Sequence, residues 1–359
     1  MVTGLAAAAA ALPVVSSAWP AREQPVDVGA LREKMLRSDR VQHQGNAESV
    51  GRLALPELPK LASVTALLTG TTQVRTWYAG PDSYRFAVVS TAGEQDVYHS
   101  GDVETLWDYV QSTFTETDAD LPLRLPRAGD LLPPDLARRI LATSVGDTVT
   151  SIPAKRVGGA SAAGLRLVPA DRDTSIGYVD MWADPDSGLP VQVEITAKDT
   201  GQPVVLSRFL DYSLGPPPAS ALEYDPGPEL PARMLATPDV AAILATAGLV
   251  RLPLVLADRQ QRVNAQLSLP GVGMYGTGLS SFVVLQLPRG LVNSAVDAAT
   301  KAGAQEVDNI VQLTIPPVSL ALLRRTVARR TYLLTGLVSP QVLQRAAKEL
   351  AVQPPRSSR

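Results

Sequence analysis

The chain contains no cysteine and only two histidines, His43 and His99, among its 359 residues. The absence of cysteine excludes disulfide bonds, thiolate metal ligands, a cysteine nucleophile and the lipid-bearing cysteine of an anchored bacterial lipoprotein. Two isolated histidines also argue against a histidine-based metal site, because a protein-bound zinc ion takes three or four side-chain ligands. We therefore expect no bound metal ion.

Signatures of the common enzyme classes are missing as well. There is no G-x-x-x-x-G-K-[ST] phosphate loop and no G-x-S-x-G nucleophile turn. A Ser-His-Asp triad would depend on one of two histidines that lie in strand or turn patterns, and the carboxylates at residues 94–96 and 184–186 are typical of solvated turns. The sequence therefore predicts a non-enzymatic protein without a cofactor.

The stretch "PGVGMYGTG", residues 270–278, contains a G-x-G-x-x-G pattern. A dinucleotide fingerprint needs a buried strand directly before it and a helix directly after it, so that helix N–H groups meet the pyrophosphate. Here Pro270 interrupts the preceding strand, and the following "LSSFVVLQLP" has the β-branched composition of a strand. These flanks favour a glycine-rich strand-to-strand turn over a phosphate site.

No apolar run in the chain reaches the roughly 20 residues that a membrane-spanning helix needs. The run from Leu5 to Val15 is followed by Ser16-Ser17-Ala18, which resembles a secretory signal and its cleavage site, although no Lys or Arg precedes it. The alternative is an alanine-rich helix packed on the protein. We predict an export segment at 1–21, and a mature chain in the periplasm or extracytoplasmic envelope without a stable membrane span.

The first half of the remaining chain has the pattern of an antiparallel sheet with a few helices. Helical spacing predicts helices at 27–38 and 133–144. Alternating and aromatic-rich runs predict strands at 41–55, 70–80, 83–91, 154–170, 176–184, 189–199 and 202–215, with two further short strands within 94–117. Turn tripeptides and short connections between these runs leave no room for parallel crossovers.

Residues 215–231 form a proline-rich linker that we expect to separate two domains, at 22–214 and 232–350. The charge changes there too: residues from Glu229 onward hold 14 basic and 7 acidic side chains, leaving 19 and 28 for the preceding part. The second domain is predicted to contain helices at 237–248, 290–303 and 339–350 and strands at 251–258, 262–270, 279–288, 309–317 and 330–338. Residues 351–359 are expected to be a disordered tail.

Two segments suggest contact with a partner. The apolar connection at 53–70 is unusually long and apolar for a solvent-exposed loop. It either caps one end of the sheet, or serves as a mobile flap over an apolar cavity, or contacts a membrane or a partner. The basic segment "LLRRTVARRTYLL" is either a solvated helix face or a site for an acidic partner or anionic headgroups. Its arginines are Arg324, Arg325, Arg329 and Arg330. Nucleic acid is not expected as a partner of an exported chain with a pI near 5.8.

Three motifs in the first domain carry a family resemblance. They are the aromatic-x-G-P-D-x-aromatic-R turn at Tyr78 to Arg85, the "LWDY" strand at Leu106 to Tyr109 and the W-x-D-x-x-x-G-L-P hairpin at Trp182 to Pro190. In these motifs the chain resembles the bacterial lipoprotein-carrier superfamily of LolA-like and LolB-like proteins. Its two-domain layout is similar to the sigma-E regulatory proteins of the RseB (MucB) type.

The resemblance implies an α+β fold: a curved antiparallel half-barrel sheet with helices covering its concave side, plus a smaller α+β C-terminal domain. It also implies that the concave face holds acyl chains of a lipid or lipoprotein, and alternating apolar residues fit such a site. The residues predicted to line it are Val74, Phe86, Val88, Trp107, Met181, Val193, Ile195 and Leu206. A one-residue register error would invert this choice of face, and ordinary core positions are the alternative.

Two functions follow from the resemblance. The first is an exported, non-enzymatic lipid or lipoprotein carrier that buries acyl chains in an apolar cavity. Each buried methylene contributes about 0.8 kcal/mol, so a long chain can be held without polar specificity. The alternative is a negative regulator of the RseB type that senses lipid or envelope stress. Its basic second domain would bind an anti-sigma factor or another membrane protein.

Overall fold

The computed structural model describes most of the two predicted domains. The described residues are 21–23, 25–53, 62–90, 93–119, 126–224, 233–234, 249–262, 270–324 and 330–352. Residues 1–20 of the predicted export segment, the whole of the predicted helix at 237–248 and residues 263–269 of the predicted strand at 262–270 lie outside this part of the chain. The predicted tail at 351–359 is wrong for its first two residues, which end a helix, and residues 353–359 lie outside the described chain.

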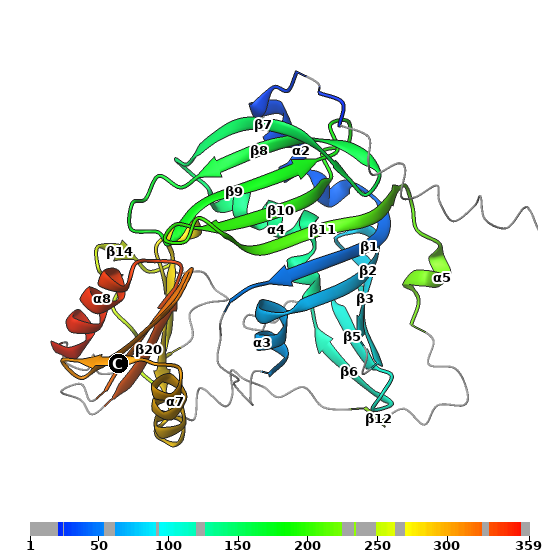
Figure 1. Ribbon diagram of the computed structural model, residues 1–359. Helices are drawn as coiled ribbons and strands as arrows, with labels where there is room; N and C mark the ends of the chain where they lie inside the picture. Colours follow the sequence, from blue (N-terminus) through cyan, green and yellow to red (C-terminus); the bar gives the residue numbers. More distant parts are fainter. Residues whose placement is uncertain are drawn as a thin grey trace, which may run out of the picture.

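A large, strongly curved sheet forms the first domain, in the strand order β12-β6-β5-β4-β3-β2-β1-β11-β10-β9-β8-β7 (Figure 1). Eleven strands pair antiparallel, and only the two-residue β12 pairs parallel, with β6. The strands are β1 (His43–Gly51), β2 (Thr71–Gly80), β3 (Ser83–Ser90), β4 (Gly93–Ser100), β5 (Val103–Asp108), β6 (Thr113–Asp118), β7 (Thr148–Val157), β8 (Ala160–Val168), β9 (Ile176–Ala183), β10 (Pro190–Ala197), β11 (Pro203–Leu214) and β12 (Arg233–Met234). The predicted curved antiparallel sheet is confirmed.

Two strand predictions in this sheet are wrong in detail. The single strand predicted at 154–170 is a hairpin of β7 and β8, which turns at Gly158 and Gly159, both with positive φ. The segment 94–117 spans parts of three strands, β4 to β6, instead of containing two. The Gly158-Gly159 pair is a hairpin-turn signal that the prediction of a single strand overlooked, whereas the turn at 109–112 contains neither glycine nor proline to mark it.

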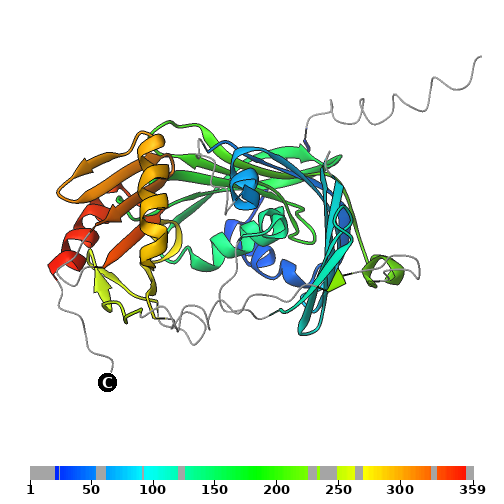
Figure 2. The same cartoon turned by 90° about the horizontal axis from the view of Figure 1, so that it is seen from below.

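Helices fill the hollow of the curved sheet. Figure 2 shows α2 (Val28–Leu36) and α4 (Pro133–Thr143) inside the curve, with the short helices η1 (Ser38–Arg40) and η3 (Ala128–Leu131). Asp27 caps α2 by accepting a 2.9 Å hydrogen bond from the Ala30 N–H, and prolines begin α4. Their apolar faces pack on β8, β9 and β10, so the concave side is covered as the resemblance implied.

The apolar connection at 53–70 contains α3 (Ala62–Thr69), which lies against β1 and β2. Its C-terminal end approaches β1 so closely that a Cβ at Gly51 would lie 2.3 Å from the Leu68 carbonyl carbon. The Leu53 N–H donates to the Leu68 carbonyl at 3.0 Å. The described part of this connection therefore packs on the sheet, while residues 54–61 lie outside the described chain.

The start of the predicted linker crosses the convex face of the sheet. It contains α5 (Ala219–Leu222), after which Tyr224 contacts the rings of Tyr98, Trp107 and Phe114 at centroid distances of 5.5, 5.9 and 6.1 Å. Just beyond the predicted linker, β12 pairs with the free edge of β6, so Arg233 and Met234, which were predicted to belong to the second domain, join the first-domain sheet. The chain between the domains is thus held against the convex face at α5 and Tyr224 and against the sheet edge at β12 (Figure 1).

A smaller antiparallel sheet forms the second domain, in the order β15-β16-β20-β19-β18-β17. Its elements are β15 (Val272–Tyr275), η4 (Gly278–Ser280), β16 (Phe282–Leu287), α7 (Arg289–Lys301), β17 (Gln305–Val307), β18 (Ile310–Ile315), β19 (Val318–Leu323), β20 (Thr331–Gly336) and α8 (Pro340–Val352), with a separate hairpin of β13 (Val255–Leu256) and β14 (Arg259–Gln260). The buried face of α8 packs on this sheet. The expected smaller α+β domain is confirmed, with β19 as a strand that the sequence pattern did not indicate.

The glycine stretch at 270–278 crosses from strand to loop. Residues 272–275 are strand β15, and Gly276 and Gly278 adopt φ of 82° and 54°, which favour glycine. Tyr275 is fully buried, stacks on Phe282 at 5.2 Å and donates to the Pro253 carbonyl at 2.6 Å. The stretch is architectural, and it leads directly into the contact between the domains.

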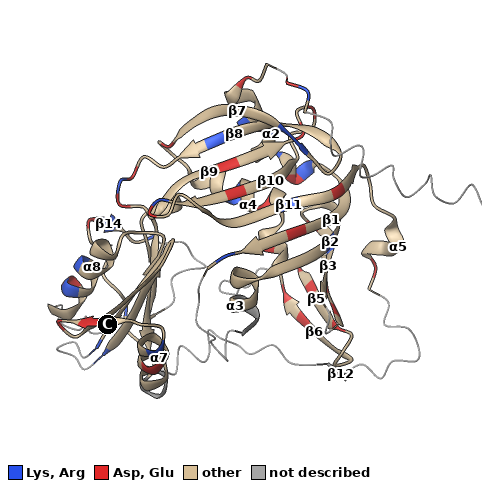
Figure 3. Ribbon diagram, in the orientation of Figure 1, with Lys and Arg blue, Asp and Glu red and all other residues tan. Residues whose placement is uncertain are grey.

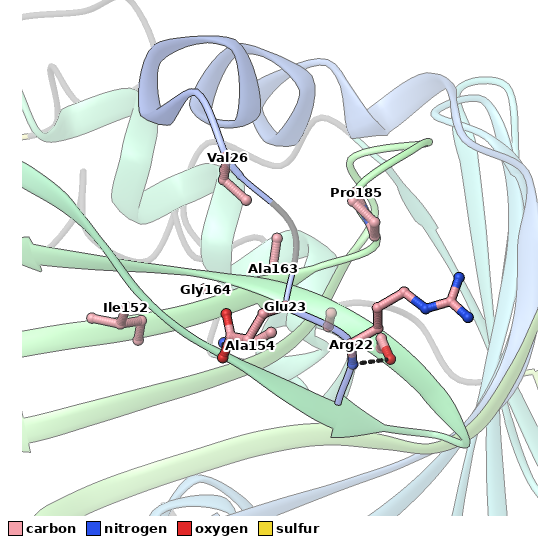
Figure 4. Close-up of a pocket in the computed structure, with 10 residues that line it drawn as sticks. Arg22, Glu23, Val26, Ile152, Ala154, Ala163, Gly164 and Pro185 are labelled. Atoms are coloured by element: carbon pink, nitrogen blue, oxygen red, sulfur yellow. Dashed lines mark hydrogen bonds between the residues drawn. The ribbon is translucent and has the colours of Figure 1, made fainter. Parts of the chain in front are cut away.

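The chain before α2 crosses the end of the β7–β8 hairpin (Figure 4). The Arg22 N–H donates to Ser161 Oγ at 3.0 Å, and a Glu23 carboxylate oxygen accepts from the Ala154 N–H at 3.2 Å. A cavity of about 20 Å³ lies beneath it, lined in part by Val26. This segment shields the outer edge of the sheet, which limits unwanted strand pairing there.

Candidate functional site

Six of the eight residues predicted to line an acyl-chain site lie on the concave face. Val74, Phe86 and Val88 belong to one cluster on β2 and β3, and Met181, Val193 and Ile195 belong to a second cluster beneath α2 and α4. Met181 and Val193 are fully buried. The concave face is therefore apolar, but the protein's own helices occupy much of it.

Trp107 and Leu206 lie on the convex face instead. Leu106 pairs with Val97 of the concave cluster, so its neighbour Trp107 points to the opposite side. Likewise Ser207 donates to the Leu131 carbonyl of η3, which places Leu206 on the outside. The prediction that these two side chains line the concave face is therefore wrong, because they point to the other side of the sheet.

The concave face holds a cavity of about 220 Å³ at the end of the sheet formed by β2 to β5, hereafter the concave cavity. Tyr78, Tyr84, Phe86 and Leu132 supply its apolar wall. Its charged lining residues are Asp39, Glu104, Arg127, Asp130, Asp135, Arg138 and Arg139. A single apolar side and a charged rim suit an amphiphilic molecule or segment better than a purely apolar one.

The arginines of this rim already have carboxylate partners. Arg127 is paired with Glu104, and Arg139 Nη2 lies 2.6 Å from an Asp130 oxygen. Arg138 is paired with Asp135 in the same helix. A ligand that binds here must fit beside these pairs or exchange with one of them, so a bare anion is poorly matched to the rim.

Burial and pairing shift two titrations near the concave cavity. Burial raises the pKa of Glu104, but the neighbouring His99, Arg127 and Tyr84 outweigh burial and lower that pKa to about 2. Burial lowers the pKa of His43 to about 4, against the smaller effect of its hydrogen bond with the Val41 carbonyl. At neutral pH Glu104 is ionised and His43 is neutral.

Within the described ranges no cluster of His, Cys, Asp and Glu side chains is arranged to hold a metal ion.

Sequence reasoning missed these charged residues because they come from separate elements. Glu104 lies on β5, Arg127 lies before η3, and Arg138 lies on α4. No local motif joins them. The only sequence signal was the position of Arg138 and Arg139 within an otherwise amphipathic helix.

A groove of about 570 Å³ lies between the two domains, hereafter the interdomain groove. The first domain contributes Arg52, Thr200 and residues 202–204, and the second contributes Ala302 and residues 313–316. Beside it, Val204 and Ile315 are buried in one shared apolar cluster. A molecule bound in this groove contacts both domains at once.

The predicted basic segment begins in the last two residues of β19 and ends in β20, and its four arginines lie between these strands. Arg324, directly after β19, donates from Nη1 to both carboxylate oxygens of Glu306 in β17, each at 3.2 Å. Arg330 directly precedes β20. Arg325 and Arg329 lie outside the described residues. The described flanks at 322–323 and 331–334 are strands, and the choice between a solvated helix face and a partner site for the arginines stays a prediction, because residues 325–329 lie outside the described chain.

Charge is distributed unevenly over the described chain. Figure 3 shows acidic residues recurring along β5 and β6 of the first domain, whereas α8 of the second domain carries Arg345 and Lys348. No helix of the described ranges combines the length and the apolar character that crossing a bilayer requires.

Comparison with solved structures identifies a two-domain match. MucB in complex with MucA(peri) is 16% identical in sequence, and the match covers 92% of this chain and all of that chain with a TM-score of 0.52. The chain shares the two-domain fold of MucB. The Pseudomonas aeruginosa MucA/MucB complex agrees, with 17% identity, the same coverage and a TM-score of 0.53. The suspected layout is thereby confirmed at the level of the fold.

A LolA superfamily protein from Nitrosomonas europaea is a more distant match. It is 14% identical, and the match covers 56% of this chain and 99% of that chain with a TM-score of 0.25. No family model and no curated protein matches the sequence.

Proposed function

We propose that this chain is a non-enzymatic binding protein of the bacterial envelope, exported across the membrane, that regulates a partner in the manner of MucB. The partner is an extracytoplasmic segment of a membrane-anchored anti-sigma factor. One observation carries the proposal: the match to MucB, solved in complex with MucA(peri), extends over both domains and the whole MucB chain.

The interdomain groove is the surface that we assign to this partner. Both domains line it, and its wall combines apolar groups of Val204 and Leu313 with the polar groups of Arg52 and Thr314. An extended segment bound there would be sensitive to the relative position of the domains. The basic residues Arg324, Arg325, Arg329 and Arg330 offer an additional contact for an acidic partner.

Binding is tested with the extracytoplasmic segments of the anti-sigma factors encoded in the same genome, by calorimetric titration of the full chain. One segment should bind, and Thr314→Arg should weaken its binding at least about tenfold, because the exposed Thr314 lines the groove. Thr148→Arg, at an exposed position of β7, is the matched control and should bind like the unaltered chain. Absence of binding by every segment would refute the proposal.

A second function, carriage of an acyl lipid, is favoured by one specific observation. Six of the predicted lining residues share the apolar concave face. Native mass spectrometry of the chain purified from its host checks this function. An acyl lipid bound together with failure of all anti-sigma segments favours carriage, whereas a lipid-free chain that binds a segment favours regulation alone.

A further inference from the structure

The loop containing η4 reaches from the second domain onto the end of α4 in the first domain. A Cβ at Gly278 would lie 2.8 Å from the Thr143 carbonyl oxygen, at the last residue of α4. Leu279, only 8% exposed, enters the apolar cluster that contains Leu141 and Met181. A residue of the second domain thus completes the core beneath the helices of the first.

Polar contacts fix this loop in place. The buried Thr174 hydroxyl donates to the Leu279 carbonyl and lies 3.2 Å from the Leu337 carbonyl oxygen. Arg259 lies 2.9 Å from Asp171 and donates to the Ser280 carbonyl at 3.3 Å. The loop is held from both sides, so Leu279 has a defined position against α4.

The same helix borders the concave cavity at its other end. Asp135, Arg138 and Arg139, in the first two turns of α4, line that cavity. Ile140 and Leu141 follow and are buried against the sheet, and Thr143 meets the second domain. One helix of 11 residues therefore spans the distance between the cavity and the interdomain contact.

We propose that α4 couples the concave cavity to the seating of the second domain, with Leu279 as the coupling residue. A molecule that enters the cavity by displacing α4 also displaces the surface on which Leu279 rests, and this loosens the interdomain contact. Thermodynamic linkage makes the effect reciprocal: unseating the second domain loosens α4 and opens the concave face. The inference rests on the proposed function only for its biological meaning, because the coupling itself needs no partner.

Hydrogen exchange of the full chain, followed by mass spectrometry, tests the coupling without any ligand. Leu279→Ala should speed exchange of the α4 amides about tenfold or more, because a cavity opens beneath α4. Arg345→Ala is the matched control: it removes the 3.5 Å pair with Asp173 at the same domain contact, away from α4. Leu279→Val gives a graded second variant that retains most of the packing.

Two results decide the matter. Faster α4 exchange in the Leu279 variants, graded with side-chain size and absent in Arg345→Ala, supports the coupling. Unchanged α4 exchange in both Leu279 variants, or the same increase in the control, overturns it. Neither result depends on binding of an anti-sigma segment, so failure here is distinguishable from failure of the proposed function.

The reciprocal direction is tested by distance measurement between the domains. The chain lacks cysteine, so dyes can be attached selectively to Asp186→Cys and Lys301→Cys, both at exposed positions. Ile140→Ala, which loosens α4, should broaden the interdomain distance distribution measured by energy transfer. A distribution identical to that of the parent labelled chain would overturn the reciprocal coupling.

Discussion

Removal of the Asp96 carboxylate should be the most damaging single change on the convex face. Asp96 is fully buried and lies 2.5 Å from Arg85 Nη2. The hydroxyls of Tyr98 and Tyr109 also donate to it, at 3.1 and 3.2 Å. The Arg85 guanidinium lies over the ring of Trp77 at 4.5 Å, so it cannot easily turn to solvent when its partner is lost.

The expected magnitude follows from this geometry. Breaking a buried ion pair by removing one partner costs about 3–5 kcal/mol, and the 16% exposure of the Arg85 side chain places Asp96→Ala near the lower end, about 3 kcal/mol. Asp96→Asn keeps the shape and loses the charge, so we expect about 2 kcal/mol. The double variant Arg85→Met, Asp96→Leu leaves no unpaired charge and should cost less than the sum of its single changes.

Urea unfolding followed by tryptophan fluorescence measures these values, with Asp102→Ala, in an exposed turn, as the control. Arg85 also donates to the Ala221 carbonyl of α5 at 3.3 Å, so Asp96→Ala should additionally speed proteolysis of the linker. A cost below about 1 kcal/mol for Asp96→Ala would refute the reasoning, because it would mean that Arg85 finds solvent without its partner.

Three further predictions concern stability. Gly188→Ala should destabilise the chain more than Gly201→Ala, as measured by thermal unfolding. Both glycines have positive φ, but a Cβ at Gly188 would lie 2.4 Å from Lys34 Cβ, whereas a Cβ at Gly201 would meet no atom within 4 Å. Because the pKa of Glu104 is lowered in the folded state, its stabilising contribution is lost as pH falls from about 4.5 towards 2, and Glu104→Gln should flatten this part of the pH profile of unfolding. The pKa of His43 is also lowered in the folded state, so the unfolded chain takes up the proton at a higher pH than the folded chain. Stability should therefore decrease as pH is lowered from 6.5 to about 4, and His43→Gln should remove that decrease.

Most elements of the first domain could be predicted because their periodicity is local. The helix at 27–38 and the strands at 176–184 and 189–199 match α2, β9 and β10 closely. The turn at Gly158 and Gly159 was missed although a Gly-Gly pair between two strand-like runs is a hairpin signal, because the whole of 154–170 was interpreted as one strand. Strand β19 was missed for a similar reason, since the apolar run at 318–323 does not alternate with polar residues.

The candidate sites depend more strongly on tertiary structure. Alternation along each strand predicted an apolar face, yet the direction of Trp107 was fixed only by pairing with neighbouring strands. The charged rim of the concave cavity joins Glu104 and Arg127, which lie 23 positions apart, through the folding of η3 onto the sheet. No periodic pattern in the sequence indicates that two residues so far apart in the chain lie close together in the fold.

The glycine stretch shows the same division most clearly. Its composition alone determined that the chain turns sharply at Gly276 and Gly278, because φ values of 82° and 54° are costly for other residues. Only the tertiary structure decided what the turn is for: it brings Leu279 into the core of the other domain. Local sequence sets backbone conformation and which face is apolar, whereas long-range packing decides which surfaces meet, and the function proposed here depends on surfaces that meet.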